Sequence, residues 1–172
     1  MSRSAEVREQ VVALLPRLRR FARTIARRPH DADDLVQITV ERALLRCEQW
    51  RPDTRLESWM FSIMKNAWID EMRARVRRDR VLAPEEAGLD VGDSSADAQV
   101  ASMSVESAMA QLPEEQRMAV ALVLVEGLSY KEAAYVADVP IGTLTSRLAR
   151  GRDALMKILG EGEGEGPAGE QS

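Results

Sequence analysis

Apolar residues recur every three to four positions along most of this chain, and this spacing predicts amphipathic helices. Residues 5–28 carry one apolar stripe, and we expect Pro16 to kink this helix or to begin a fresh one. Residues 31–47 predict a second helix, with Asp31 or Asp33 as its N-cap because a short carboxylate side chain satisfies free backbone N–H groups. The pattern therefore indicates that the chain begins with two helices.

The next segment, residues 56–80, divides into two unlike halves. Its first half, ESWMFSIMKNAWIDEM, is apolar on nearly all sides, so we expect it at the centre of a helical bundle. Trp59, Phe61 and Trp68 lie in this half, and aromatic residues at helical spacing are more often core than ligand-stacking groups. The second half, RARVRRDR, is basic on every side and cannot be core, so it lies either in solvent or along phosphate.

A second helical group is predicted after residue 104. Residues 105–112 form a short helix, and Pro113 is expected at the first position of the next one. The dense apolar run over residues 118–125 is also compatible with a buried strand, but its flanks have helix-capping chemistry and favour a helix. Gly127 is the expected C′ residue of that helix.

Residues 128–158, LSYKEAAYVADVPIGTLTSRLARGRDALMKI, predict two helices joined by a tight turn. Ser129 and Glu132 form a capping box at the start of the first, and the Pro-Ile-Gly sequence breaks the run before a new helix near Thr143. The second helix has an apolar side and a polar side. The apolar side comprises Leu144, Leu148, Gly151, Leu155 and Ile158, and the polar side Thr143, Ser146, Arg147 and Arg150.

This arrangement indicates a helix-turn-helix whose second helix enters a DNA major groove. Arginine reads guanine with two hydrogen bonds, and serine or threonine contacts phosphate or base edges. A surface helix whose arginines are merely solvated is the alternative, because patterns of this kind produce many false positives.

Net charge is −4, but its distribution is uneven. Residues 1–83 carry +6, residues 84–107 carry −6, residues 108–159 are neutral and residues 160–172 carry −4. The local field at a contact surface, rather than the total charge, decides affinity for nucleic acid. The negative total therefore does not exclude a nucleic-acid partner.

We expect an all-α fold of two small helical domains with separate cores. The first domain spans residues 5–82 and the second residues 105–160, joined by a flexible acidic linker over residues 83–104. Residues 161–172 form an acidic, Gly-rich tail that we expect to be disordered, and it either repels nonspecific nucleic acid or has no role.

Composition argues against several classes of protein. The chain has no apolar stretch of about 20 residues and no signal peptide, so we expect a cytoplasmic protein without membrane insertion. Its one cysteine, Cys47, is expected to be structural, and its one histidine, His30, is expected in a loop or helix start rather than a metal site. A single histidine permits no nucleophile–histidine–acid set, so we predict no enzyme, no metal and no cofactor.

Two stretches resemble a known family. DADDLVQITVERAL followed by LESWMFSIMKNAWIDEMRARVRR is similar to region two of bacterial extracytoplasmic-function (ECF) sigma factors, which are group 4 of the sigma-70 family. LPEEQRMAVALVLVEGLSYKEAAYVADVPIGTLTSRLARGRDAL is similar to their region four. The resemblance covers roughly residues 8–159. It implies a subunit that gives core RNA polymerase its promoter specificity, with the β′ clamp helices, the β flap, promoter DNA and an anti-sigma factor as partners.

The resemblance also implies roles for individual residues. The expected polymerase-binding residues are Asp34, Leu35, Val36 and Gln37, with Leu35 and Val36 exposed; helix N-cap and first-turn chemistry is the alternative for this segment. The expected contacts to the minus-ten promoter element are Lys65, Asn66, Arg73, Arg75, Arg77 and Arg78. The expected contacts to the minus-thirty-five element are Lys131, Thr143, Ser146, Arg147 and Arg150.

Two points remain open in this comparison. Gly151 stands where many relatives carry alanine or another helix former, at a cost of up to about 1 kcal/mol, which questions the rigidity of the last helical turns. A sigma mimic that sequesters an anti-sigma factor without binding promoters is the alternative function. Such a mimic needs neither the basic cluster from Arg73 to Arg78 nor the basic face from Thr143 to Arg150, and this chain carries both.

Overall fold

The computed structural model describes residues 2–81 and 104–161, and every element within these two ranges is helical, which confirms the predicted all-α class. The predicted tail beyond residue 161, and the predicted linker apart from Ser104, lie outside the described residues. The elements are α1 (Arg3–Ala26), α2 (Pro29–Leu45), η1 (Cys47–Gln49), α3 (Leu56–Val81), α4 (Val105–Ala110), α5 (Glu114–Val120), η2 (Ala121–Val125), α6 (Tyr130–Ala137) and α7 (Ile141–Glu161).

Helix α1 runs through Pro16 as one element, so of the two outcomes expected at Pro16 the fresh helix is wrong. The predicted cap of the second helix is also wrong. Helix α2 begins at Pro29 with Arg28 at the N-cap position, and neither Asp31 nor Asp33 caps it. Proline is suited to the first helical position because its fixed φ is already helical and its missing N–H has no partner to lose there.

The apolar run after Pro113 is helical, as predicted. Helix α5 begins at Glu114, one residue later than expected, and Pro113 occupies the N-cap position. The chain continues as the π-helical turn η2, in which the Glu126 N–H donates to the carbonyl of Ala121 at 2.9 Å. Gly127 follows with φ of +70°, the left-handed conformation that the predicted C′ role requires.

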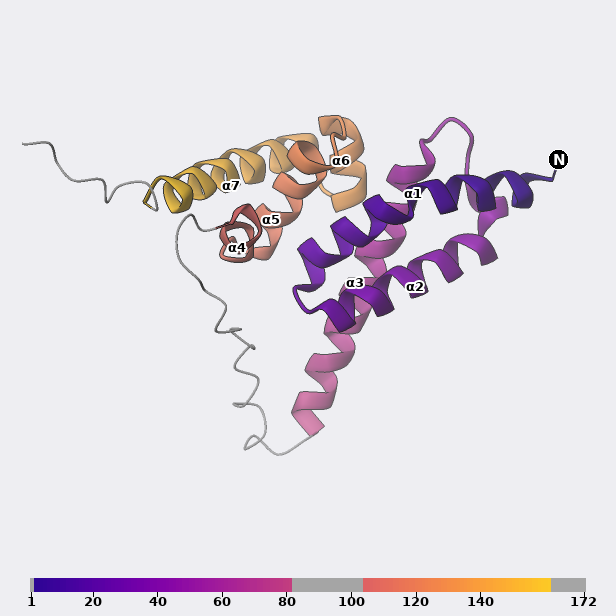
Figure 1. The fold of residues 1–172 in the computed structure, drawn as a ribbon, viewed down its shortest axis with the longest axis horizontal. Helices are drawn as coiled ribbons and strands as arrows, with labels where there is room; N and C mark the ends of the chain where they lie inside the picture. Colours follow the sequence, from indigo (N-terminus) through magenta and orange to yellow (C-terminus); the bar gives the residue numbers. More distant parts are fainter. Residues whose placement is uncertain (1, 82–103, 162–172) are drawn as a thin grey trace, which may run out of the picture.

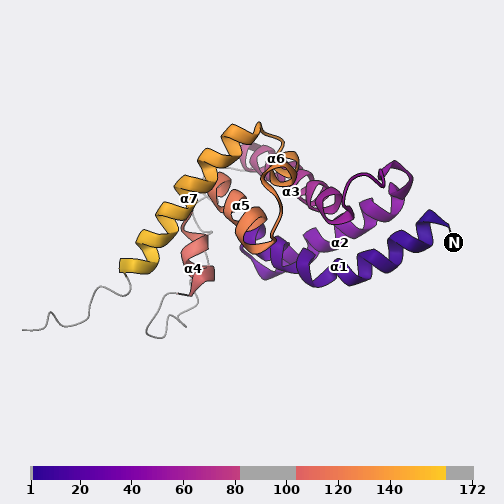
Figure 2. The ribbon, with the colours of Figure 1, turned by 90° about the horizontal axis from the view of Figure 1, so that it is seen from above.

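The helices form two groups that pack against each other (Figures 1 and 2). Helices α1, α2 and α3 form the first bundle, and α4 to α7 with η2 form the second. Helix α6 packs on the first half of α3, while α1 contacts α4, α5 and η2. The basic end of α3 extends beyond the body of the molecule in Figure 1.

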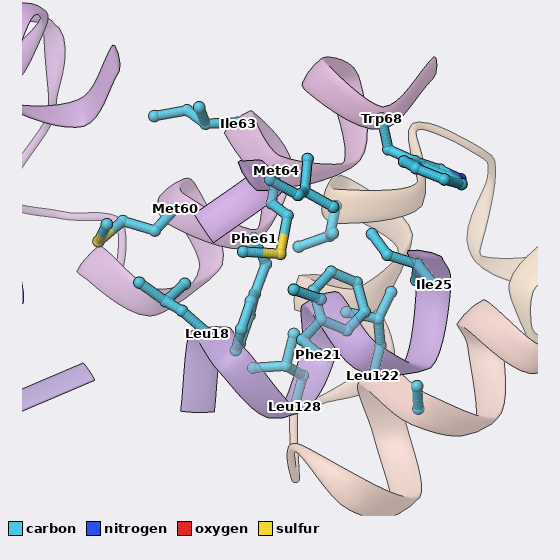
Figure 3. Packing of buried hydrophobic residues seen from close by; sticks show 14 of the residues in the cluster. Leu18, Phe21, Ile25, Met60, Phe61, Ile63, Met64, Trp68, Leu122 and Leu128 are labelled. Carbon is cyan, nitrogen blue, oxygen red and sulfur yellow. The ribbon is translucent and has the colours of Figure 1, made fainter. Parts of the chain in front are cut away.

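The expectation of two separate cores is wrong, because one continuous apolar cluster joins the bundles. Figure 3 shows Phe21 of α1 and Phe61 of α3 beside Leu122 of η2 and Leu128. The two phenylalanine rings meet edge-on with centroids 4.9 Å apart. Each of the four side chains is at most 3% exposed. The residual apolar face of each bundle is thus buried against the other, which removes it from water.

Candidate nucleic-acid interfaces

The start of α2 holds the segment predicted to bind polymerase. Asp34 and Gln37 are exposed there, and Asp34 Oδ2 lies 3.5 Å from His30 Nε2. Leu35 is 3% and Val36 8% exposed, so the expectation that they face solvent is wrong. Both side chains belong to the buried apolar cluster, and the face of α2 that packs inward is broad enough to hold two adjacent positions while Asp34 and Gln37 lie at its edges.

The basic end of α3 is partly neutralised by the protein itself. Arg75 Nη2 donates to Asp31 Oδ1 at 2.8 Å, and this hydrogen bond is the main reason why the pKa of Arg75 is raised above its usual value. Arg75 and Arg78 each donate to Glu71 at 3.1 Å. Arg75 therefore ties the first turn of α2 to α3 and is not a free phosphate contact in this conformation.

Arg73 and Arg77 differ from Arg75 and Arg78. Both are exposed, and neither forms an ion pair with any residue in the two described ranges. Arg73 and Arg77 are therefore the members of the predicted cluster whose charge is directed toward solvent.

Lys65 occupies an unexpected position for a predicted DNA contact. It is only 6% exposed, and burial lowers the pKa of its ammonium group below the usual value, although the charge of Asp138 opposes this shift. Its neighbour Asn66 is exposed. Trp68, one turn further along α3, donates its indole N–H to Glu114 Oε1 of α5 at 3.2 Å. The second bundle therefore covers the Lys65 side of α3 and leaves the Asn66 side open.

The two helices and turn predicted after Leu128 are present as α6 and α7. Ser129 is the N-cap of α6, and its side chain accepts a hydrogen bond from the Glu132 N–H at 3.1 Å. The turn is made by Asp138 in the left-handed conformation, with φ of +55°. Helix α7 begins at Ile141, two residues before the predicted start at Thr143.

Glycine is required at position 151 by a close helix contact that the sequence did not reveal. A Cβ atom at this position would lie 2.8 Å from Val120 Cγ2 and 3.1 Å from the backbone oxygen of Gln116. Glycine therefore lets α7 approach α5 more closely than any other residue permits. This contact packs α7 against α5 at Gly151, and Leu144 and Leu148 on the same stripe are at most 2% exposed, whereas Leu155 and Ile158 in the last turns are half-buried.

The outer face of α7 presents most of the predicted minus-thirty-five residues. Ser146 and Arg150 are exposed, and Thr143 is half-buried. Arg147 is half-buried and pairs with Glu115 at 3.4 Å, a carboxylate that is itself 70% exposed. Lys131 is exposed near the start of α6. Four charged or hydroxyl side chains of α7 thus share one helical face, two of them exposed, and such a face is what major-groove reading requires.

A polar contact between the bundles was not predicted from the sequence. The Glu126 side chain, 1% exposed, accepts hydrogen bonds from Arg20 Nε and Nη2 at 2.7 and 2.9 Å. Arg17 Nη2 donates to the backbone oxygen of Glu126 at 2.7 Å. The hydrogen bonds from Arg20 to the Glu126 carboxylate are the main reason why the pKa of Arg20 is raised. Because the partners are more than 100 positions apart in the chain, no local pattern indicates the pair.

A second contact changes the predicted role of Glu132. Its carboxylate was expected to reach back to the N-cap, but it accepts instead from Ser58 Oγ at 3.3 Å and pairs with Arg55 at 3.6 Å. Both partners belong to the first bundle, at the start of α3. Across residues 2–81 and 104–161, no three His, Cys, Asp or Glu side chains come together as a metal ion would require. Within the same ranges, no helix has the length and apolar character needed to span a membrane.

Comparison with protein families matches both parts of the chain. Residues 11–78 match Sigma-70 region 2, and residues 102–155 match Sigma-70 region 4. The ECF RNA polymerase sigma factor EcfG of Rhodopseudomonas palustris is 33% identical over 156 residues, which cover 89% of this chain and 84% of that protein. The ECF sigma factor SigM of Mycobacterium tuberculosis is 36% identical over 143 residues, covering 83% and 71%.

A solved structure agrees with these sequence matches. The sigma factor RpoE of Bartonella quintana, in complex with the anti-sigma factor NepR, superposes with a TM-score of 0.74 at 28% identity. The similarity covers 90% of this chain and 97% of that one. With regions two and four in the same order and with relatives above 30% identity over most of its length, this chain belongs to the ECF RNA polymerase sigma factors.

Proposed function

We propose that this protein is a dissociable subunit of RNA polymerase that directs transcription initiation to a specific set of promoters. The observation that carries the proposal is the presence of both sigma regions on one chain, with the outer face of the region-four helix α7 exposed. Sigma factors are not enzymes, so the function lies in binding polymerase and DNA together.

The α7 face is proposed to read the minus-thirty-five element. Arg150 and Ser146 extend from it into solvent, and Arg147 reaches the same side once it leaves the exposed carboxylate of Glu115. An exposed ion pair of this kind is worth only about 0–1 kcal/mol, so exchanging Glu115 for DNA costs little. Lys131 and Thr143 would add contacts to phosphate.

The first bundle is proposed to bind polymerase and the minus-ten element. Asp34 and Gln37 are the exposed groups that would contact the β′ clamp helices, while Leu35 and Val36 would hold the helix in place through the core. Arg73 and Arg77 would follow the promoter phosphates together with Asn66, and Arg75 and Arg78 would join them on leaving Asp31 and Glu71. Contacts of this kind predict steep salt dependence, because each neutralised phosphate releases counterions.

The bundles are proposed to separate when the subunit binds polymerase and DNA. Lys65 is enclosed by the second bundle, and Trp68 is hydrogen-bonded to it, so a DNA contact by Lys65 requires that α6 leave α3. The acidic groups Glu126 and Glu132 hold basic residues of the first bundle in the closed arrangement. The free chain should therefore bind promoter DNA weakly.

Regulation by an anti-sigma factor is part of the same proposal. RpoE of Bartonella quintana is described in complex with NepR, and its similarity extends over nearly the whole of this chain. A protein that binds both bundles at once would hold them in an arrangement that polymerase cannot use. We propose such a partner for this chain.

The test is transcription in vitro with purified bacterial core polymerase on a library of genomic fragments. Adding this protein should produce initiation at a defined subset of promoters. The double variant Arg147→Ala, Arg150→Ala should reduce initiation at those promoters by at least about 30-fold, since each of the two guanine contacts contributes about 1–3 kcal/mol.

The matched control removes two exposed arginines at the start of α1, far from α7 in Figure 1, through Arg3→Ala and Arg8→Ala. This control should initiate as the unmodified protein does. Core polymerase that gains no promoter selectivity from the unmodified protein, at any salt concentration between about 50 and 200 mM, would contradict the proposed function. If the unmodified protein binds an anti-sigma factor but supports no transcription with core polymerase, the result would favour a sigma mimic.

A further inference from the structure

A cavity of about 760 Å³ lies where the two bundles meet, apart from the surfaces assigned above. Helix α1 and the residue after it contribute Arg19, Arg23 and Arg27 to its wall. Helix α4 contributes Met109, and η2 contributes Val125. The cavity thus has arginines on one side and apolar residues on the other, and its volume is in the range of sites for small organic ligands.

The three arginines of the α1 wall are an unfavourable arrangement on their own. Arg19 and Arg23 are one turn apart on α1, and Arg27 follows directly after the helix end with φ of +60°; all three line the cavity. Like charges at this spacing destabilise a helix. No acidic side chain within residues 2–81 and 104–161 forms an ion pair with any of the three.

A fourth arginine in the cavity wall is buried without a carboxylate partner. Arg117 of α5 is 3% exposed, and its Nη1 donates to the Leu112 carbonyl at 3.1 Å, but its Nε has no hydrogen-bond partner. Burial, and then the charge of Arg27, lower the pKa of Arg117 below its usual value. A buried guanidinium is costly unless an anion compensates it.

The acidic groups near the cavity do not balance this charge. Glu126 already forms ion pairs with Arg17 and Arg20. Arg20 also lines the cavity, which brings the arginines of its wall to five among the described residues. Glu106 is the one carboxylate among the described residues that line the cavity. An excess of positive charge therefore remains around a concave, partly apolar space, where Arg19, Arg23 and Arg27 are exposed and able to meet a ligand from solvent.

We propose that this cavity binds a small polyphosphate anion such as a nucleoside triphosphate, with its phosphates held by Arg19, Arg23 and Arg27. Guanidinium forks match phosphate oxygens with two hydrogen bonds each, which makes arginine the residue suited to this group. The apolar wall at Met109 and Val125 offers a surface for the base. The concave shape favours a small anion over the backbone of a DNA duplex.

Occupancy would affect the arrangement of the bundles, because the wall comes partly from α1 and partly from the second bundle. A ligand that contacts both sides binds only the closed form and shifts the population toward it. Binding itself does not depend on the proposed function. Its consequence for transcription does, and the ligand would there delay opening of the bundles.

The experiment is isothermal titration calorimetry of the full chain with three probes: ATP, inorganic tripolyphosphate and adenosine. ATP and tripolyphosphate should bind with one-to-one stoichiometry, and adenosine should bind at least tenfold more weakly than either. The double variant Arg23→Ala, Arg27→Ala should weaken ATP binding at least tenfold. ATP should also raise the Tm of the unmodified protein and not that of this variant.

The control variant Arg3→Ala, Arg8→Ala removes the same charge from the exposed start of α1 and should bind ATP unchanged. An equal loss in this control would overturn the proposal, since it would show attraction to net charge alone. Binding of nonspecific duplex DNA or of hexaglutamate, with neither phosphate probe bound, would also overturn it. Tripolyphosphate, which polymerase does not incorporate into RNA, should slow initiation in the core-polymerase transcription assay at constant free Mg²⁺. An unchanged rate there would overturn the proposed effect on bundle opening, and the titrations above test binding separately.

Discussion

The two surfaces expected to contact DNA differ in their availability. The outer face of α7 is open, with Ser146 and Arg150 in solvent. The Lys65 side of α3 is closed, because α6 packs against it and Glu114 of α5 accepts the indole N–H of Trp68. One promoter element can thus be approached by the free chain, while full contact with the other requires rearrangement.

The difference follows from how each helix uses its apolar residues. Helix α7 has a single apolar stripe, which Leu144 and Leu148 bury against its own bundle. Its opposite face is polar and therefore needs no cover from water. The first half of α3 is apolar on nearly all sides and must be covered by more than α1 and α2. The second bundle supplies that cover and in doing so buries the Lys65 side chain, which then cannot reach DNA.

The largest effect is expected where the open surface depends on close helix packing. Gly151→Val would place its side chain against Val120 and the backbone of Gln116. Such overpacking costs about 1–3 kcal/mol, so we expect a lower free energy of unfolding in a denaturant titration and weaker binding to minus-thirty-five DNA.

The control for this prediction is Gly142→Ala, also in α7, where an added Cβ meets nothing within 4 Å. We expect this variant to be as stable as the unmodified protein or more stable, because alanine has the higher helix propensity. Equal stability of Gly151→Val and Gly142→Ala would show that α5 and α7 are not as closely packed as described.

The next effect concerns the closed surface. Glu126→Ala removes a buried carboxylate that holds Arg17 and Arg20, and hydrogen bonds to charged groups contribute about 1.5–3 kcal/mol. The bundles should separate more often, and Lys65 should become accessible. The chain has three lysines, and acetylation of Lys65 measured by mass spectrometry reports this directly against exposed Lys131.

A matched variant separates this effect from general loss of charge between the bundles. Glu132→Ala removes a pair with Arg55, whose side chain is 59% exposed, and exposed pairs contribute about 0–1 kcal/mol. Lys65 should therefore stay more protected in Glu132→Ala than in Glu126→Ala. Full reactivity of Lys65 in the unmodified protein would contradict the closed arrangement itself.

The smallest effect is a pH dependence. Burial lowers the pKa of Lys65 below its ordinary value of 10.5, so at lower pH the folded protein carries the full penalty of an enclosed charge. As pH rises through the folded pKa toward 10.5, the unfolded chain holds more protons at this site than the folded one, and stability increases. Denaturant titrations between about pH 8 and 10.5 measure this increase.

Lys65→Met is the control, because it keeps an unbranched side chain without the charge. The increase in unfolding free energy with pH should be smaller in Lys65→Met than in the unmodified protein over this window. Identical pH slopes for the two proteins would mean that Lys65 titrates as a solvated amine.

Much of the local structure could be predicted from the sequence. Apolar spacing gave the extents of α1, α3 and the helix pair α6–α7, and Ser129 and Gly127 marked helix ends by capping chemistry that depends on neighbouring residues alone. The start of α2 was placed wrongly, since a carboxylate near a helix start suits the cap, but Pro29 already fixed the first turn.

Which residues face solvent was harder to predict at the candidate sites. Leu35 and Val36 were expected to be exposed, but their apolar side chains complete the core of the first bundle. Lys65 was expected on a DNA-binding face, but this part of α3 is where the second bundle packs. Both errors arise because the exposure of a residue depends on which other helices pack against it. Apolar spacing along one helix does not identify those helices.

The sequence alone determined the helices, their caps and the order of two regions that identify the family, because those signals act over a few neighbouring residues. Only the tertiary structure decided that the two cores are continuous and that Glu126 holds Arg17 and Arg20. Only it showed that Gly151 is required by a close helix contact. These features join residues far apart in the chain, and their energies arise when apolar faces and charges from different helices are removed from water together.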